Sequence, residues 1–123
     1  MLLDIPASKN MPRVSFDMGV LTLEGRSIPQ DSSPFYKPIL KSLNDYALSP
    51  NDETIINIKI EFLNSDSMRS LMNILIIAEK IFLNGHKVFV KWYYNDTEDV
   101  IYDSGTIYKS LLELPIDLIQ RTP

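Results

Sequence analysis

The stretch from Thr54 to Tyr93 restricts the fold more than any other part of the chain. Residues 54–62 alternate between large apolar and polar side chains, which predicts a strand with one buried face. A largely apolar helix is predicted from about Ser67 to Asn84, and a β-branched, aromatic strand follows at 87–93. Two strands joined by a crossover helix normally lie parallel in one sheet. The sequence therefore predicts an α/β fold built on a parallel β-α-β unit.

The residues before this unit predict an antiparallel hairpin and a helix. Residues 14–17 and 20–25 alternate in polarity around a Met-Gly turn. A helix is expected to begin at Ser33-Pro34, because serine caps free backbone amides and proline is tolerated in the first turn. Pro38 removes a further backbone hydrogen bond, so we expect a bent or tight turn there.

The residues after the unit predict a third helix and a short edge strand. The helix is expected to begin near Thr97, where acidic side chains complement its dipole, and to end at Pro115. Gly105 is expected to weaken or break it, and residues 116–119 form the strand. The predicted architecture is a mixed sheet of four to five strands with about three helices packed on it.

The length of 123 residues suits one domain, which we place at 13–120 with tails at 1–12 and 121–123. With 45% hydrophobic and 23% charged residues, the composition is that of a soluble globular protein. The start of the chain lacks the features of a signal peptide, and no apolar run reaches the roughly 20 residues of a bilayer span. We therefore expect a cytoplasmic protein that does not insert into membranes.

Several kinds of chemistry are disfavoured by the residues present. The absence of cysteine excludes thiolate metal sites and cysteine nucleophiles, and the net charge of −4 without a basic cluster argues against nucleic-acid binding. His86, the one histidine, follows the helix-ending Gly85 and is interpreted as structural. The glycines are isolated, so no phosphate-binding loop is present. A nucleotide-binding enzyme is therefore disfavoured, and no catalytic residue, cofactor or metal site is predicted.

One alternative function remains open near the carboxyl end of the second parallel strand. Trp92, Tyr93 and Tyr94 could stack on a ligand, although aromatic side chains in strands usually belong to the core or the sheet surface. Four acids follow them, at Asp96, Glu98, Asp99 and Asp103, without the spacing of a calcium loop. They favour a solvated helix start over a cation site. The alternative is a small-molecule-binding or catalytic α/β domain that uses this region.

The turn between the long strand and the apolar helix consists of Asn64, Ser65, Asp66 and Ser67. All four are of types that cap helix N-termini. A phosphate on a hydroxyl here would bring about −1.5 to −2 charges to the positive end of the helix, with Arg69 one turn away. The fold would tolerate this charge while the surface seen by a partner changes, which is the physical requirement for a switch.

The apolar helix carries one narrow polar stripe. At 100° per residue, Arg69, Asn73 and Lys80 share this stripe, and large apolar side chains border it. Met72, Ile76 and Leu83 lie along one edge, toward which Ser65 also projects, and Ile77 lies along the other. Such a surface is a candidate docking site. The residues expected to contact a partner are Asn64, Ser65, Asp66, Arg69, Met72, Asn73, Ile76 and Lys80.

Several short motifs occur together between Phe16 and Ile119. They are Val20-Leu21-Thr22-Leu23-Glu24-Gly25, Phe35-Tyr36-Lys37-Pro38-Ile39-Leu40, Phe62-Leu63-Asn64-Ser65, Gly85-His86-Lys87-Val88, Trp92-Tyr93-Tyr94 and Glu98-Asp99. In this combination the chain resembles the SiaC-type regulatory phosphoproteins, which are bacterial proteins with a fold like the STAS domain of anti-sigma-factor antagonists.

The resemblance implies a non-enzymatic partner-switching protein. It implies phosphorylation by a dedicated kinase with a histidine-kinase-like ATPase fold, and dephosphorylation by a PP2C-like phosphatase. The unphosphorylated form would bind and activate a diguanylate cyclase, in cyclic-di-GMP signalling and biofilm growth. The acceptor hydroxyl of the family falls on Ser65, with Ser67 as the second choice, and Asp66 stands where the family has a neutral side chain.

Overall fold

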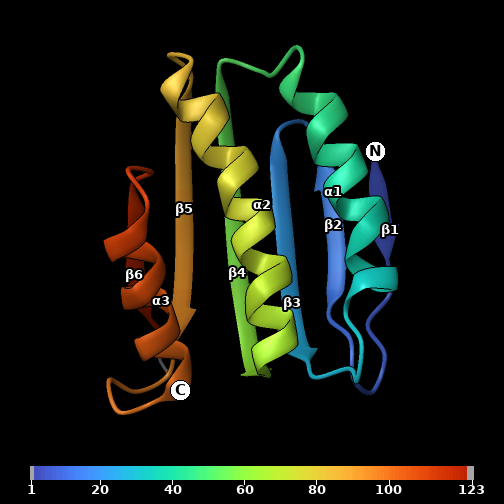
Figure 1. Cartoon of the computed structure of the whole chain (residues 1–123), viewed down its shortest axis with the longest axis vertical. Coiled ribbons are helices and arrows are strands. Elements are labelled where there is room, and N and C mark those ends of the chain that lie inside the picture. Colours follow the sequence, from blue (N-terminus) through green and yellow to red (C-terminus); the bar gives the residue numbers. More distant parts are fainter. Residues whose placement is uncertain (1, 122–123) are drawn as a thin grey trace.

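Six strands form one sheet in the order in which they occur along the described residues, 2–121 of this computed structural model. Figure 1 shows the elements, and their bounds are β1 (Leu3–Ile5), β2 (Arg13–Asp17), β3 (Val20–Ser27), α1 (Ser33–Ala47), β4 (Glu53–Leu63), α2 (Ser65–Leu83), β5 (Lys87–Tyr94), α3 (Val100–Leu111) and β6 (Ile116–Gln120). β1, β2 and β3 pair antiparallel, whereas β3, β4, β5 and β6 pair parallel. The predicted α/β class, hairpin and parallel pair are confirmed.

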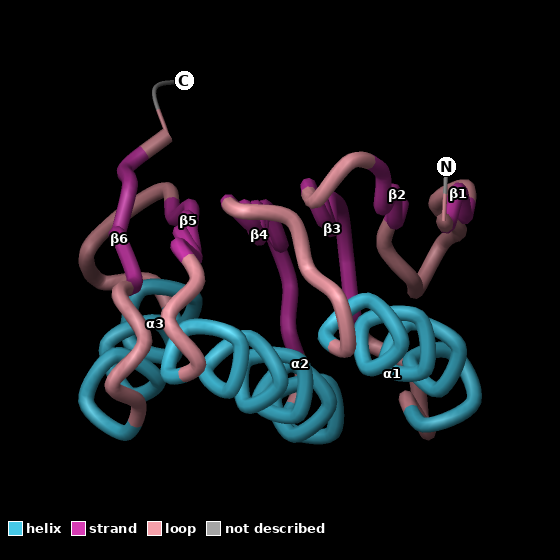
Figure 2. The backbone as a smooth tube through the Cα atoms, turned by 90° about the horizontal axis from the view of Figure 1, so that it is seen from above, coloured by secondary structure: helices cyan, strands magenta, loops and turns pink. Residues whose placement is uncertain are grey.

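Within residues 2–121, all three helices cover the same face of the sheet, and the other face has no helix on it (Figure 2). Each helix connects two neighbouring parallel strands, so the strand order never reverses. Such a sheet has no switch point, the place where open α/β sheets usually bind ligands in a crevice. A binding surface is therefore expected on the helices or at the carboxyl ends of the strands.

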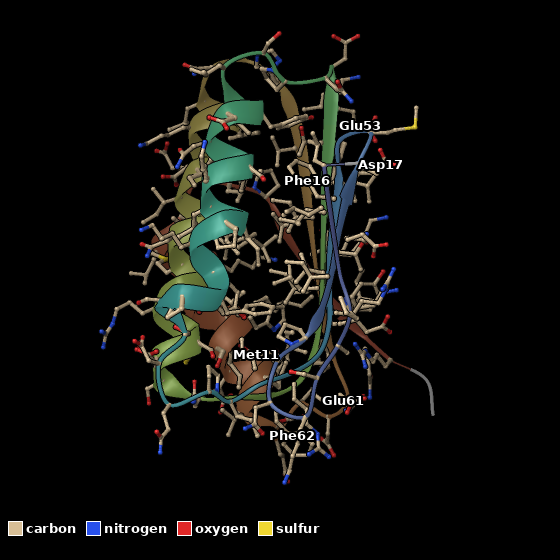
Figure 3. All side chains as sticks on the ribbon, turned by 90° about the vertical axis from the view of Figure 1, so that its right-hand side faces the viewer. Met11, Phe16, Asp17, Glu53, Glu61 and Phe62 are labelled. Atoms are coloured by element: carbon tan, nitrogen blue, oxygen red, sulfur yellow. The ribbon has the colours of Figure 1, made fainter. Side chains whose placement is uncertain are left out.

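The core lies between the sheet and the helices. Phe16 projects from β2 toward α1 (Figure 3) and packs edge-on against Tyr46, with ring centroids 5.2 Å apart. Side chains without exposed surface come from β2, β3, β4, α1, α2 and β5, and include Val14, Leu21, Leu23, Ile39, Leu43, Ile56, Leu71, Ile74, Leu75 and Trp92. Burial of each large apolar side chain contributes about 1.5–3 kcal/mol to folding. This continuous core fixes α2 over β4 and β5.

The sheet has one more strand than predicted, because β1 pairs near the start of the chain, and pairing near the other end also extends past the predicted edge strand. β1 lies within the predicted tail at 1–12, and its residues pair with Val14 to Phe16 of β2. At the other end, the N–H of Arg121 donates to Tyr94 O at 2.7 Å, within the predicted tail at 121–123. The prediction that residues 1–12 and 121–123 are tails is therefore wrong for these paired residues. Met1, Thr122 and Pro123 lie outside the described residues.

The helix boundaries differ from the predictions by a few residues. α1 starts one residue earlier than expected, because Ser33 is its first residue and not its cap. Ser32 is at the cap position without a side-chain cap hydrogen bond, and the helix continues through Pro38. α2 starts at Ser65, two residues before the predicted start, because Asn64 caps it. α3 starts at Val100 with Asp99 as its cap, and Gly105 does not break it. A Cβ on Gly105 would lie 2.5 Å from Trp92 Cδ1, so this glycine lets α3 pack closely on the sheet.

Candidate functional site

The turn singled out in the sequence lies where β4 ends and α2 begins, at the carboxyl edge of the sheet (Figure 1). Asn64 caps α2, since its Oδ1 accepts the N–H of Ser67 at 2.9 Å. Its Nδ2 donates to Pro29 O at 2.6 Å. One amide side chain therefore caps the helix and ties it to the loop between β3 and α1.

Ser65 is the first residue of α2, and it is exposed. Among the described residues, none forms a hydrogen bond with its hydroxyl group. The helix does not depend on this hydroxyl for its cap, because Asn64 supplies the cap. Ser65 is thus an accessible hydroxyl at the positive end of a 19-residue helix, where added negative charge is favourable.

Ser67 has a different environment and has no exposed surface. Ser27 Oγ donates to Ser67 Oγ at 2.7 Å and lies 2.6 Å from the hydroxyl of Tyr36. Burial raises the pKa of Tyr36 to about 12, so its hydroxyl remains protonated in this network. Burial disfavours Ser67, the second choice of phosphate acceptor, because an enzyme could reach its hydroxyl only if this network opened.

Asp66 joins the N-termini of α1 and α2. Its Oδ2 accepts the N–H of Ser32 at 2.6 Å, and its backbone carbonyl accepts the Ser32 hydroxyl at 3.2 Å. The Ser32 hydroxyl also lies 2.6 Å from Ser70 Oγ. The hydrogen bond from the Ser32 N–H is the main cause that lowers the pKa of Asp66, and Arg69, 4.0 Å away, makes a smaller contribution. Asp66 therefore has a structural role beside Ser65.

Replacing Asp66 by asparagine is expected to lower the stability of the fold at pH 7. The neutral amide accepts the Ser32 N–H more weakly than a carboxylate does. Because the pKa of Asp66 is lowered in the folded state, its stabilisation is present above the ordinary value of 3.8 and is lost as the pH falls through the folded value. Urea denaturation at pH 7 and near pH 3 measures the difference from the wild type, which should shrink at the lower pH.

Asp45→Asn is the matched control, since the side chain of Asp45 forms an exposed pair with Lys41 on α1. It should leave the stability nearly unchanged at both pH values. A loss of stability in Asp66→Asn no larger than in this control would contradict the role of Asp66 as a link between the two helices.

The polar stripe of α2 faces solvent as predicted. Arg69, Asn73 and Lys80 are exposed, and Met72 and Ile76 beside them are partly buried. Leu83 is also exposed, and Figure 1 shows α2 lying between α1 and α3 across the sheet. The prediction that Ile77 borders the stripe along its other edge is wrong, because Ile77 is only 7% exposed and belongs to the core.

The aromatic cluster does not converge on one pocket. Trp92 is buried and donates its Nε1–H to Ile101 O at 2.8 Å, and Tyr94 packs edge-on against Tyr102. Tyr93 lies on the opposite face of the sheet, where Lys59 Nζ is 5.2 Å from its ring. These contacts account for the aromatic side chains without a ligand.

The acids after β5 lie in the turn before α3, at its cap and in its first turn. Asp99 Oδ1 accepts the N–H of Ile101 at 3.1 Å, and Asp96 Oδ1 accepts that of Glu98 at 3.1 Å. Across residues 2–121, no three His, Cys, Asp or Glu side chains gather in a way that could hold a metal ion. Within the same range, no helix is long and apolar enough to cross a membrane.

Sequence reasoning missed two features around Ser65. The contacts of Asn64 with Pro29 and of Asp66 with Ser32 join residues about 35 positions apart, so no local pattern indicates them. The second feature is a depression of about 510 Å³ at the carboxyl edge, lined by residues of β4, of α3 and of the loops that follow β3 and β5. No sequence signal indicated this depression, because the alternation of β4 predicts a buried side chain at Phe62, which is 53% exposed.

Comparison with known proteins supports one family over nearly the whole chain. The model of the SiaC family, described as regulatory phosphoproteins, matches residues 5–121. A protein of Pseudomonas aeruginosa (strain UCBPP-PA14), described only as uncharacterized, is 23% identical over 115 residues, which cover 92% of this chain and 91% of that protein.

Solved structures share the fold. Apo-SiaC from Pseudomonas aeruginosa matches with a TM-score of 0.86 and 21% identity, covering 95% of this chain and 97% of the other. A crystal structure of the diguanylate cyclase SiaD in complex with its activator SiaC, from the same species, matches with a TM-score of 0.87 and 19% identity, covering 97% and 99%.

Proposed function

Because the chain belongs to the SiaC family of regulatory phosphoproteins, we propose that it is a non-enzymatic signalling switch, reversibly phosphorylated at Ser65. The observation that carries the proposal is the exposed hydroxyl of Ser65 at the start of α2, beside an exposed stripe. The hydroxyl is accessible to an enzyme, and the helix cap does not depend on it. The phosphate acceptor and the docking surface are thus adjacent on one helix.

We propose that the unphosphorylated form binds and activates a diguanylate cyclase. SiaC of Pseudomonas aeruginosa, which shares this fold, has been crystallised as the activator of the diguanylate cyclase SiaD. The pathway would be bacterial cyclic-di-GMP signalling, which controls biofilm growth, in the cytoplasm. A dedicated kinase and a PP2C-like phosphatase would add and remove the phosphate.

The charged residues of the α2 stripe indicate how a phosphate could change binding. Arg69 and Lys80 make the exposed stripe positive, which favours acidic groups on a partner. A phosphate on Ser65 would lie one helical turn from Arg69 and offset its charge. It would also repel acidic groups of the partner. The domain itself should keep its fold, because the phosphate lies at the favourable end of the helix.

The test is to add the purified, unmodified protein to a diguanylate cyclase of the same organism. We expect binding by isothermal titration and faster formation of cyclic-di-GMP, with no product from the protein alone. The proposal would be contradicted if no diguanylate cyclase of the organism bound the protein or responded to it.

Asn73→Glu is expected to weaken this binding by about tenfold or more, because it puts a negative charge in the middle of the positive stripe. Asn44→Glu is the matched control, since Asn44 is an exposed asparagine on α1 outside the stripe. Titration of both variants into the cyclase measures the effect. Equal affinities of the two variants for the cyclase would show that the α2 stripe is not part of the interface.

A further inference from the structure

The first turn of α1 is held by residues near the start of α2. Both helices begin at the carboxyl edge of the sheet, side by side (Figure 1). Ser32, at the cap position of α1, makes no side-chain cap hydrogen bond within its own helix. Its N–H donates to the Asp66 carboxylate at 2.6 Å, and its hydroxyl donates to the Asp66 carbonyl and lies 2.6 Å from Ser70 Oγ. The start of α1 therefore depends on contacts with α2.

Buried hydroxyl groups occupy the contact between these two helix starts. Ser27, Ser32, Ser67 and Ser70 are at most 7% exposed, and Tyr36 joins them through Ser27. Farther along both helices the buried side chains are apolar, and they include Ile39, Leu43, Ile74, Ile77, Ala78 and Ile81. Water competes for hydrogen bonds but not for apolar contacts, so the first turn of α1 should open more easily than the rest of the helix.

Arg69 connects this contact to Ser65. Residues three and four positions apart lie on the same side of a helix, so Arg69 is a neighbour of both Asp66 and Ser65. Its guanidinium group lies 4.0 Å from Asp66 Oδ1, and its side chain is 80% exposed. A phosphate on Ser65 carries more charge than a carboxylate and can accept two hydrogen bonds from a guanidinium group. Arg69 would therefore turn to the phosphate, and Asp66 would lose its positively charged partner.

The phosphate would also act on Asp66 directly. The two charged groups would belong to neighbouring residues, and the Asp66 side chain is only 33% exposed, so water screens their repulsion only in part. When the first turn of α1 opens, water reaches the carboxylate and the repulsion falls. Opening of this turn is therefore more favourable in the phosphorylated protein than in the unmodified one.

We propose that a phosphate on Ser65 loosens the first turn of α1 through Arg69 and Asp66, so that the modification changes the surface of two helices. This inference rests on the proposed function, because it takes Ser65 as the phosphate acceptor. The apolar core stays in place, since the opening involves only the hydroxyl contacts. The favourable interaction of the phosphate with the start of α2 offsets the loss at α1, so the melting temperature should change little.

Hydrogen exchange measured by NMR tests this inference without a partner protein. The N–H groups of Phe35 and Tyr36 donate to Ser32 O at 3.1 and 3.0 Å, so their exchange rates report the opening of the first turn of α1. Phosphoserine incorporated at position 65 should raise both rates about threefold to tenfold at constant pH. The N–H of Leu43, later in α1, should exchange at an unchanged rate. Phosphoserine at position 110, an exposed serine on α3, is the matched control and should change none of these rates.

The Asp66→Asn variant shows whether Asp66 carries the effect. Its amide has no charge for the phosphate to repel, so phosphoserine at position 65 should change the rates of Phe35 and Tyr36 by less than about twofold in this variant. Circular dichroism verifies that the variant is folded. An equal increase with aspartate and with asparagine at position 66 would overturn the inference.

The comparison within the wild-type chain is decisive even if the variant does not fold. Unchanged exchange of Phe35 and Tyr36 on phosphorylation would overturn the inference, while a loss of cyclase binding in the same phosphorylated protein would still support the proposed switch. Faster exchange together with undiminished cyclase binding would support the inference and contradict the switch.

Discussion

Replacing Ser65 by glutamate is expected to weaken binding to the diguanylate cyclase by about tenfold or more, whereas Ser65→Ala should stay within about twofold of the wild type. Ser65 is exposed and its hydroxyl caps nothing, so alanine removes no contact that the described residues show. Glutamate at the first position of α2 suits the helix dipole but adds charge beside the Arg69 stripe. Isothermal titration of both variants into the cyclase measures the difference.

Ser33→Glu provides the control for this experiment. Ser33 is also an exposed serine at the first position of a helix, on α1 rather than α2. It should leave the affinity for the cyclase unchanged, and all three variants should melt close to the wild type. Equal affinities of Ser65→Ala and Ser65→Glu would exclude charge at this position as the switch.

Gly105→Ala is expected to lower the free energy of unfolding by about 1–3 kcal/mol, the usual cost of overpacking a core. Helix propensity alone favours alanine over glycine by about 1 kcal/mol, so this substitution usually stabilises a helix. Here we expect the opposite effect on the free energy of unfolding. The added Cβ would lie 2.5 Å and 2.6 Å from Trp92 Cδ1 and Nε1, and 2.8 Å from Leu118 Cδ2. Trp92 has no exposed surface and cannot move aside into solvent.

Urea denaturation followed by tryptophan fluorescence and circular dichroism measures this effect. Ser110→Ala, at an exposed position of the same helix, should change the stability by less than about 0.5 kcal/mol. A Gly105→Ala variant as stable as the wild type would show that α3 can shift on the sheet without loss, and that the close contact with Trp92 does not fix its position.

The central elements of the fold could be predicted because their patterns are long. The sequence of β4 alternates from Ile56 to Phe62 and α2 has an apolar face over 19 residues, so their types and their parallel connection follow from periodicity. β1 has only three residues, too few for a period, and it is recognised only by its pairing with β2. Gly105 seemed a helix breaker because local propensity does not show that α3 packs against Trp92.

The candidate site was predicted in outline but not in its contacts. The turn, its exposure at Ser65 and the outward stripe follow from residue types and helical spacing. Residue types do not show which of the four cap-forming residues caps the helix. Because Asn64 is the cap, α2 starts two residues earlier than predicted, with Ser65 on the surface and Ser67 in the core. Asp66 contacts Ser32, which is 34 residues away, so only the folded chain shows that this acid stabilises the turn.

The most direct measurement compares the unmodified protein with a form that carries phosphoserine at position 65, incorporated during synthesis so that no kinase is required. Both forms are titrated into the diguanylate cyclase, and mass spectrometry verifies the position of the phosphate. We predict that the two forms have similar melting temperatures, that the unmodified form binds and stimulates the cyclase, and that the phosphorylated form binds about tenfold or more weakly. Equal affinity and equal stimulation by the two forms would contradict the proposed switch.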